Sequence, residues 1–400
     1  MQIFVFAASK LDIFPRKTKD TLQILNKISN FVPVMAGIYV HIPFCKSRCV
    51  YCDFYSQTSL ALRQRYVDAV CREAEMRARY INERVRTIYI GGGTPSQLEP
   101  RQLAQILGAV GTAGEITVEM NPDDVTPDFA EQLAGLSVNR VSMGVQTFCD
   151  ERLRFLRRRH SAVQVPQAVR RLREAGIGNI SVDLMYGFPN ETMDEWMRDI
   201  DAVLALQVEH LSAYALQYEE GTPLFRMLER GEVSEMDEEL ERQMYFTLKD
   251  RLEAAGYEHY EISNFARPGY RSRHNSSYWR QVPYLGLGAA AHSFDGKNRQ
   301  WNVADINRYI EGIEQGRPVV EHETLTPDNH YNEVVMTALR TCEGIDTATL
   351  ADDYHDYCLA QAKPFLANGL LENDGTWLRL TREGLFVSDM VMTALMCVEE

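Results

Sequence analysis

Short runs of β-branched residues alternate with longer amphipathic stretches between residue 37 and about residue 219. This alternation is typical of repeated strand and helix units whose strands form a parallel sheet. Helices are predicted over 61–80 and 163–174, where apolar residues recur at helical spacing. Six strands are predicted, separated by enough chain for crossover helices, over 38–42, 87–90, 116–120, 140–144, 179–184 and 210–214. The pattern therefore predicts an α/β fold whose core is a partial (βα)6 barrel.

The regular alternation stops after residue 219. An acidic, helix-favouring stretch over 234–255 precedes an aromatic, glycine-rich region over 257–301, which we interpret as an accessory sheet. The rest is predicted to be a mostly helical, winged-helix-like domain, with helices over 332–339, 345–352 and 356–368 and a strand over 377–380. The predicted organisation is an N-terminal extension, a barrel core, an accessory region and a C-terminal helical domain, at 1–36, 37–219, 220–302 and 303–400.

Composition and charge narrow the class of protein. The chain has 400 residues, 45% of them hydrophobic, which is enough for a substantial core and for two to three domains. Its formal net charge is −14, which disfavours a surface that spreads over nucleic acid or anionic lipid. Charged residues interrupt the apolar windows before they reach the roughly 20 residues of a membrane span. We therefore expect no nucleic-acid partner and no stable membrane insertion.

The N-terminal segment does not have the order of a secretory signal. A short apolar run over 3–8 precedes the basic residues instead of following them, and no small-residue cleavage site comes after it. Met1 and Met35 both stay open as the true start. Without an export signal we expect a cytoplasmic protein whose thiols are reduced.

Three of the eight cysteines lie together directly after the first predicted strand. Cys45, Cys49 and Cys52 form a C-x3-C-x2-C pattern in the segment HIPFCKSRCVYCDF, whereas the other five are scattered. Clustered thiols in a reducing compartment indicate metal or redox chemistry. A closed zinc site takes four protein ligands, so three thiolates suit a cubane iron–sulfur cluster whose fourth iron is left for another ligand.

Further candidate ligand-binding residues lie where predicted strands end. The run Gly91 to Pro95, GGGTP, directly follows the second strand, and glycine lets the backbone approach a bound molecule closely. Ligands bind at the carboxyl ends of parallel strands. Two carboxylates, an amide and a guanidinium should therefore surround one mouth of the barrel. They belong to Glu119, Asp183, Gln146 and Arg158.

A C-x3-C-x2-C loop after the first strand of a six-stranded barrel resembles the radical S-adenosylmethionine superfamily. The resemblance implies a [4Fe-4S] cluster on Cys45, Cys49 and Cys52, with S-adenosylmethionine bound at the open iron. It also implies an electron donor for the cluster, whose electron cleaves the sulfonium to give a deoxyadenosyl radical. The cofactor contacts it implies are Tyr39, Tyr51, Gly92, Gly93, Thr94, Glu119, Gln146, Arg158, Asp183 and Ala215.

Longer motifs resemble the group related to oxygen-independent coproporphyrinogen III oxidase. They include YVHIPFC, GGGTPS, MNPDD, GVQTF, DLMYGFP, YEISNFARPG, HNSSYW and YLGLGAAAHSF. The oxidase branch has a fourth cysteine two residues after the third, and Phe54 occupies that position here. The heme-chaperone branch carries the pattern H-N-x-x-Y-W, which associates His274, Asn275, Tyr278 and Trp279 with heme.

The resemblance therefore favours a heme chaperone that passes heme to an acceptor protein. Imidazole is a common axial ligand of heme iron, and aromatic rings can pack on the flat macrocycle. His292 and His41 are rival histidines, and His41 is expected to brace the cysteine loop. Two alternatives stay open: decarboxylation of coproporphyrinogen III to protoporphyrinogen IX, and radical chemistry on another substrate.

Overall fold

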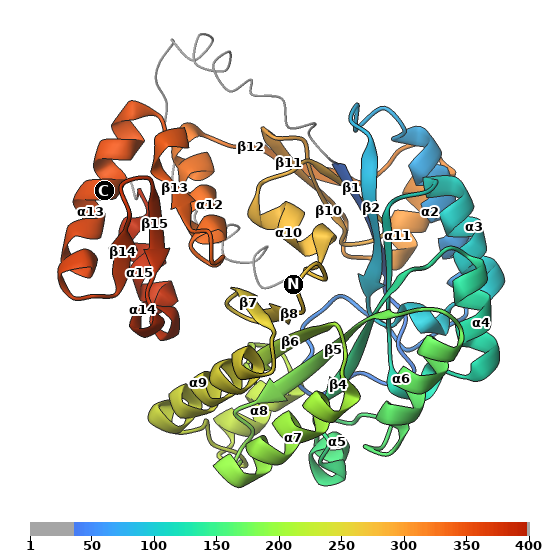
Figure 1. The fold of residues 1–400 in the computed structure, drawn as a ribbon. Helices are drawn as coiled ribbons and strands as arrows, with labels where there is room; N and C mark the ends of the chain where they lie inside the picture. The colour runs from blue at the N-terminus through green and yellow to red at the C-terminus, as the bar shows by residue number, and fades with distance from the viewer. Residues whose placement is uncertain (1–35, 398–400) are drawn as a thin grey trace.

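The computed structural model describes residues 36–397, so the predicted extension lies outside the described residues except for its last one. A 12-stranded sheet forms the main body, with strand order β12-β11-β10-β9-β1-β2-β3-β4-β5-β6-β8-β7 (Figure 1). The six central strands are parallel and follow chain order: β1 (Ala36–Ile42), β2 (Val85–Gly92), β3 (Glu115–Met120), β4 (Arg140–Gln146), β5 (Asn179–Tyr186) and β6 (His210–Ala215). These are the six predicted strands.

Helices connect the parallel strands and cover one side of the sheet (Figure 1). They are α2 (Arg63–Met76), α3 (Pro100–Val110), α4 (Pro127–Gly135), α5 (Asp150–Phe155), α6 (Gln164–Glu174) and α7 (Met193–Leu206). Short 3-10 turns follow β2 and β3, at Pro95–Gln97 and Pro122–Asp124. The predicted helices over 61–80 and 163–174 correspond to α2 and α6.

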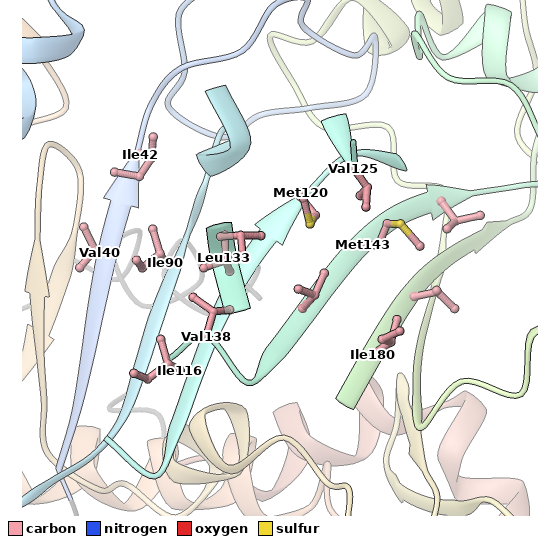
Figure 2. Close-up of a cluster of buried hydrophobic side chains, with 14 of the residues drawn as sticks. Val40, Ile42, Ile90, Ile116, Met120, Val125, Leu133, Val138, Met143 and Ile180 are labelled. Atoms are coloured by element: carbon pink, nitrogen blue, oxygen red, sulfur yellow. The ribbon is translucent and has the colours of Figure 1, made fainter. Parts of the chain in front are cut away.

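Alternation along the strands separates an apolar layer from the barrel interior. In β4, Val141, Met143 and Val145 are buried in the main hydrophobic core, while the intervening residues point to the other side of the strand. Figure 2 shows apolar side chains of this core, including Val40 on β1, Ile90 on β2 and Ile116 on β3. The side chains that alternate with them face the interior, where a ligand can bind.

The region after β6 adds strands to both edges of the barrel. The edge beside β1 gains β9 (Tyr284–Leu287), which is parallel to β1, and then antiparallel β10 (His292–Phe294), β11 (Asn298–Asn302) and β12 (Val320–Thr324). The edge beside β6 gains antiparallel β8 (Asn264–Ala266) and β7 (Glu258–Glu261). Helices α8 (Pro223–Glu229), α9 (Glu238–Ala254), α10 (Arg273–Trp279) and α11 (Ile306–Glu314) belong to the same region.

The C-terminal part has its own hydrophobic core and lies beside the barrel (Figure 1). It combines α12 (Pro327–Ala338), α13 (Asp352–Ala367), α14 (Arg382–Phe386) and α15 (Ser388–Leu395) with an antiparallel sheet of β13 (Ile345–Asp346), β15 (Trp377–Leu380) and β14 (Leu371–Asn373). The predicted helix over 345–352 is wrong: Ile345 and Asp346 pair with β15, and a 3-10 turn at Thr347–Thr349 follows. Strand pairing overrides the local helical pattern there.

The fold class agrees with the sequence-based expectation: a mostly parallel α/β barrel with an accessory sheet and a mostly helical C-terminal part. Helix α11 packs on the main core and β12 pairs with β11, so the sheet continues to residue 324. The four domain boundaries stay a prediction. None of the helices within residues 36–397 is long and apolar enough to cross a membrane.

Candidate functional site

The cysteine loop leaves the end of β1 and is fixed to its surroundings by backbone hydrogen bonds. Cys45 N–H donates to the Gln57 carbonyl at 2.9 Å, and Gln57 N–H donates to the Pro43 carbonyl at 2.7 Å. Val50, in the middle of the loop, is buried in a small apolar cluster that also contains Leu156 and Leu224. The apolar side chain anchors the loop, so its three thiols can face a cavity.

Cys45, Cys49 and Cys52 all line one cavity of about 260 Å³. Two donors point at the sulfurs: Thr94 Oγ1 lies 3.5 Å from Cys45 Sγ, and Arg158 Nη1 lies 3.6 Å from Cys49 Sγ. Donors in this position stabilise thiolates, the form that binds iron. In the described part of the chain no three His, Cys, Asp or Glu side chains are grouped as ligands of a metal ion. The fit to a cluster therefore rests on the shared cavity, the donors and the glycine turn beside them.

The glycine turn at the end of β2 is packed against this loop. A Cβ atom at Gly93 would lie 2.9 Å from the carbonyl oxygens of Ile42 and Phe44 and 3.0 Å from Cys45 Sγ. Gly92 has a φ of +112°, and a Cβ there would lie 2.6 Å from Nδ1 of His41. A larger residue at either position would displace the cysteine loop or His41.

His41 braces the loop, as expected. Its ring is fully buried, and Nε2 lies 2.9 Å from the carbonyl oxygen of Tyr55 on the far side of the cysteine loop. Tyr39, on the same strand, has its hydroxyl 3.1 Å from His41 Nδ1 and stacks on Tyr89 with ring centroids 6.2 Å apart. Burial lowers the pKa of His41 to about 4, so the ring is neutral.

Glu119 projects from β3 into the same cavity. The Tyr89 hydroxyl donates to Oε1 at 2.7 Å, and the Gly92 N–H donates to Oε2 at 3.0 Å. Burial raises the pKa of Glu119 to about 7, although the Tyr89 hydrogen bond opposes the rise and nearby Asp183 adds to it. A carboxyl so placed can accept a hydrogen bond from an ammonium group or a hydroxyl at the mouth of the barrel.

Arg158, Gln146 and Asp183 complete this end of the cavity. Arg158 Nη2 donates to the Gly144 carbonyl and, at 2.6 Å, to Oδ1 of Asn121. Gln146 ends β4 with a φ of +70°, a strained conformation for a residue with a Cβ. Asp183 accepts from the Ser142 hydroxyl at 3.5 Å, and burial raises its pKa.

The structure brings most of the predicted site residues together. The cavity is lined by Cys45, Cys49, Tyr51, Cys52, Gly92, Gly93, Thr94, Glu119, Gln146, Arg158, Asp183, Ala215 and, from the H-N-x-x-Y-W motif, Asn275. Tyr39, His274, Tyr278 and Trp279 are not in its lining. Arg140, Ser142, Ser212 and Tyr214 line it without belonging to any motif, and only the period-two alternation along their strands could have indicated them.

His274 is held inside the molecule by α10. It is 1% exposed; Nδ1 lies 2.8 Å from the Thr87 hydroxyl and Nε2 lies 2.8 Å from the Tyr278 hydroxyl. Its ring stacks on Tyr89 with centroids 5.1 Å apart. Burial lowers the pKa of His274 to about 3, and the nearby charge of Arg140 adds to the effect. Because both ring nitrogens have partners, His274 can bind iron only after one of these hydrogen bonds breaks.

Two segments of the chain match models of known protein families. Residues 39–203 match the family model of the Radical SAM superfamily, and residues 325–387 match the HemN C-terminal domain. The heme chaperone HemW of Mycobacterium tuberculosis is 36% identical over 372 residues, which cover 90% of this chain and 94% of that protein. The chain belongs to the HemW family.

Other relatives agree with this assignment. HemW of Bacillus subtilis is 32% identical over 383 residues, covering 90% of this chain and 99% of its own length. The mitochondrial radical S-adenosyl methionine domain-containing protein 1 of Bos taurus is 32% identical over 402 residues, covering 90% of this chain and 87% of that protein. The solved structure of coproporphyrinogen III oxidase HemN from Escherichia coli has a TM-score of 0.78 at 22% identity. The match covers 90% of this chain and 89% of that chain and shows the shared fold.

Proposed function

We propose that this HemW-family protein is a heme chaperone that binds heme and transfers it to an acceptor protein. The observation that carries the proposal is identity of 32–36% to heme chaperones HemW over 90% of the chain. As a radical SAM protein it would hold a [4Fe-4S] cluster and S-adenosylmethionine, and an electron donor would reduce the cluster. With no membrane-spanning helix in the part of the chain that the structure describes, we propose that it works in the cytoplasm.

The cavity residues divide into those that would hold the cluster and those that would hold S-adenosylmethionine. Cys45, Cys49 and Cys52 would supply three thiolates, and the bound cluster would supply one-electron chemistry. Arg158 places a positive charge 3.6 Å from Cys49 Sγ, which lowers the cost of negative charge at this thiolate. Thr94 donates to Cys45 and keeps that sulfur oriented.

The remaining polar groups would orient S-adenosylmethionine. Glu119 and the backbone of Gly92 and Gly93 lie beside the cysteine loop, where they can meet an amino-acid moiety. Carboxylate and amide groups on β4 and β5 can hydrogen-bond a ribose. We assign the cofactor contacts to Tyr51, Gly92, Gly93, Thr94, Glu119, Gln146, Arg158, Asp183 and Ala215, with Tyr39 supporting them through His41 and Tyr89.

Heme is proposed to bind through the motif of His274, Asn275, Tyr278 and Trp279. The motif forms α10, whose Trp279 is 9% exposed and lies under the guanidinium of Arg340 at 5.5 Å. Ligation by His274 requires that its bond to Thr87 or to Tyr278 open, so heme binding through this residue would be coupled to a movement of α10.

The second candidate function is oxygen-independent coproporphyrinogen III oxidation, because the HemN fold covers 90% of this chain. Phe54 lines the cavity beside Cys52, at the position of the additional cysteine in the oxidase branch. A phenyl ring can neither ligate iron nor take part in thiol redox chemistry. This difference favours the chaperone over the oxidase.

The deciding experiment is an anaerobic heme titration of cluster-reconstituted protein, wild type beside His274→Ala, with coproporphyrinogen turnover assayed on the same samples. Visible absorption should show stoichiometric heme binding by the wild type, weaker binding by His274→Ala, and no turnover by either. Turnover without specific heme binding would replace the chaperone by the oxidase. Equal heme binding by the two proteins would move the heme site away from His274.

A further inference from the structure

The cavity extends from the cysteine loop to the opposite end of the strands. Along β4, the alternate residues Arg140, Ser142, Gly144 and Gln146 all line it. Gln146 lies at the cluster end and Arg140 at the other, six residues away, which corresponds to about 20 Å of strand. A group bound at the cysteine loop therefore does not contact the backbone of Arg140. A different group can bind at the Arg140 end of the cavity.

Arg140 is a buried cation with an incomplete set of partners. Its side chain is 1% exposed, its Nε has no hydrogen-bond partner, and none of the ion pairs among residues 36–397 includes it. Burying a charge without a counterion is costly, and buried guanidinium groups are normally paired. Arg140 therefore differs from Arg77, a guanidinium outside the cavity that bonds Glu73, Ser293 and the Gly286 carbonyl.

Asn275 is a second polar group with an unused atom in the same cavity. It is 7% exposed, lines the cavity, and its Oδ1 has no hydrogen-bond partner among the described residues. Its place is fixed by α10, whose N-terminal cap Ser272 accepts from the Asn275 backbone N–H at 3.3 Å. The amide can rotate to offer either its oxygen or its NH2 group to a ligand.

The other ionisable groups around this end of the cavity offset the charge of Arg140 only in part. His274 and His210 are neutral, because burial lowers the pKa of both rings and the Arg140 charge adds to the effect. Burial raises the pKa of Asp183 and of Glu119, which weakens the negative charge that they place in the cavity, although the nearby charge of Arg140 opposes the rise at Asp183. Glu115 is engaged elsewhere, since it accepts the backbone N–H groups of Arg273 and His274.

We propose that Arg140 and Asn275 form a second subsite of the cavity, which binds a carboxylate group of a ligand other than S-adenosylmethionine. A carboxylate accepts two parallel hydrogen bonds from a guanidinium and a further one from an amide NH2. The carboxylate can come from two sources. One is a heme propionate, and only this version of the subsite rests on the proposed function. The other source is a small free carboxylate bound beside the cofactor.

The first test uses sodium propionate as the probe and the melting temperature of anaerobic, cluster-reconstituted protein with S-adenosylmethionine present. Propionate should raise the melting temperature of the wild type relative to chloride at equal ionic strength, and the shift should be lost in Arg140→Met and reduced in Asn275→Ala. The matched control is Arg77→Met, which removes a partly buried arginine whose Nη1 and Nη2 both have partners: it should lower the melting temperature but keep the propionate shift.

Two results would overturn the subsite. One is a propionate shift in Arg140→Met equal to that of the wild type. The other is a loss of melting temperature without propionate that is as large in Arg140→Met as in Arg77→Met, because an unpaired charge kept for a ligand should cost little stability when it is removed. If Arg140→Met does not fold, Asn275→Ala alone decides, and an unchanged propionate shift in that variant overturns the proposal.

The second test identifies the source by comparing heme with its dimethyl ester, which lacks the carboxylates. If a propionate occupies the subsite, the wild type should bind heme about tenfold or more tightly than the ester, and Arg140→Met should bind both alike. Equal binding of both by the wild type, with the propionate shift retained, assigns the subsite to a small carboxylate. If the wild type does not bind heme at all, the proposed function is overturned. The propionate test alone then decides whether the subsite exists.

Discussion

Glu119 shows how one buried carboxyl can be tuned by its neighbours. Two donors, the Tyr89 hydroxyl at 2.7 Å and the Gly92 N–H at 3.0 Å, favour its charged form, yet burial dominates and raises its pKa to about 7. The carboxyl is therefore close to half-protonated near neutral pH. Without a bound cation, the charged form of this carboxyl destabilises the folded state. A ligand that carries an ammonium group would reduce this destabilisation.

Glu119→Gln should remove a pH dependence of folding stability. The pKa of Glu119 is raised from 4.5 to about 7, so the folded chain binds this proton more tightly than the unfolded chain. Its contribution to stability is complete below pH 4.5 and is lost as the pH rises through about 7, a loss of about 3 kcal/mol at most. Chemical unfolding followed by circular dichroism at pH 5 and pH 8 should show a smaller loss in Glu119→Gln than in the wild type. The same loss in both proteins would contradict the assignment.

At the scale of elements, α10 adds a contact between the accessory region and the barrel to the strand pairs β1–β9 and β6–β8. It has only seven residues, and its first turn is held by Ser272 and by Glu115 of β3, which accepts from Arg273 N at 3.2 Å and His274 N at 3.0 Å. The far end of β3 therefore caps a helix whose Asn275 lines the cavity that Glu119 of the same strand enters. This connection links the H-N-x-x-Y-W motif to the cavity beside the cysteine loop.

Glu115→Ala should loosen α10 selectively. The substitution removes a carboxylate that accepts two N–H groups at a helix N-terminus, which should cost about 1–2 kcal/mol. Hydrogen exchange measured by mass spectrometry should therefore become faster over residues 272–280. The matched control is Thr326→Ala, which removes the cap of α12, where the hydroxyl accepts from Asn329 N at 3.1 Å. Unchanged exchange over 272–280 in Glu115→Ala would show that α10 does not depend on this contact.

The elements that sequence predicts best are those with a regular period. The six barrel strands are recovered because their apolar runs are long and bounded by turns. In contrast, Ile345 and Asp346, at the start of the helix predicted over 345–352, pair as a strand. Cysteine spacing and glycine position indicate the cluster end of the cavity. Arg140 and Ser142 carry no motif, and their place in the cavity depends on which face of β4 is turned inward, which tertiary packing decides.

At the scale of the whole molecule, two hydrophobic cores meet across apolar and polar contacts, and Leu385 and Phe386 of α14 pack on the barrel core. The second core, within the C-terminal part, is separate from the barrel core. Between them, Arg340 Nη2 lies 2.7 Å from Oε1 of Glu261, whose side chain is fully buried at the end of β7. Backbone hydrogen bonds from Ile262 N to the Arg340 carbonyl and from Cys342 N to the Tyr260 carbonyl add to this contact. The barrel and the C-terminal part are therefore expected to unfold together.

Arg340→Met should uncouple the two parts. The substitution leaves Glu261 buried without its cation, which should cost about 3–5 kcal/mol at the contact between the cores. Differential scanning calorimetry should then resolve two transitions where the wild type shows one, because each core can unfold by itself once the contact is weak. The matched control is Arg382→Met, which breaks an exposed ion pair with Asp250 at 2.6 Å and should cost at most about 1 kcal/mol without splitting the transition. A single transition in Arg340→Met at the wild-type temperature would show that apolar and backbone contacts alone hold the C-terminal part to the barrel.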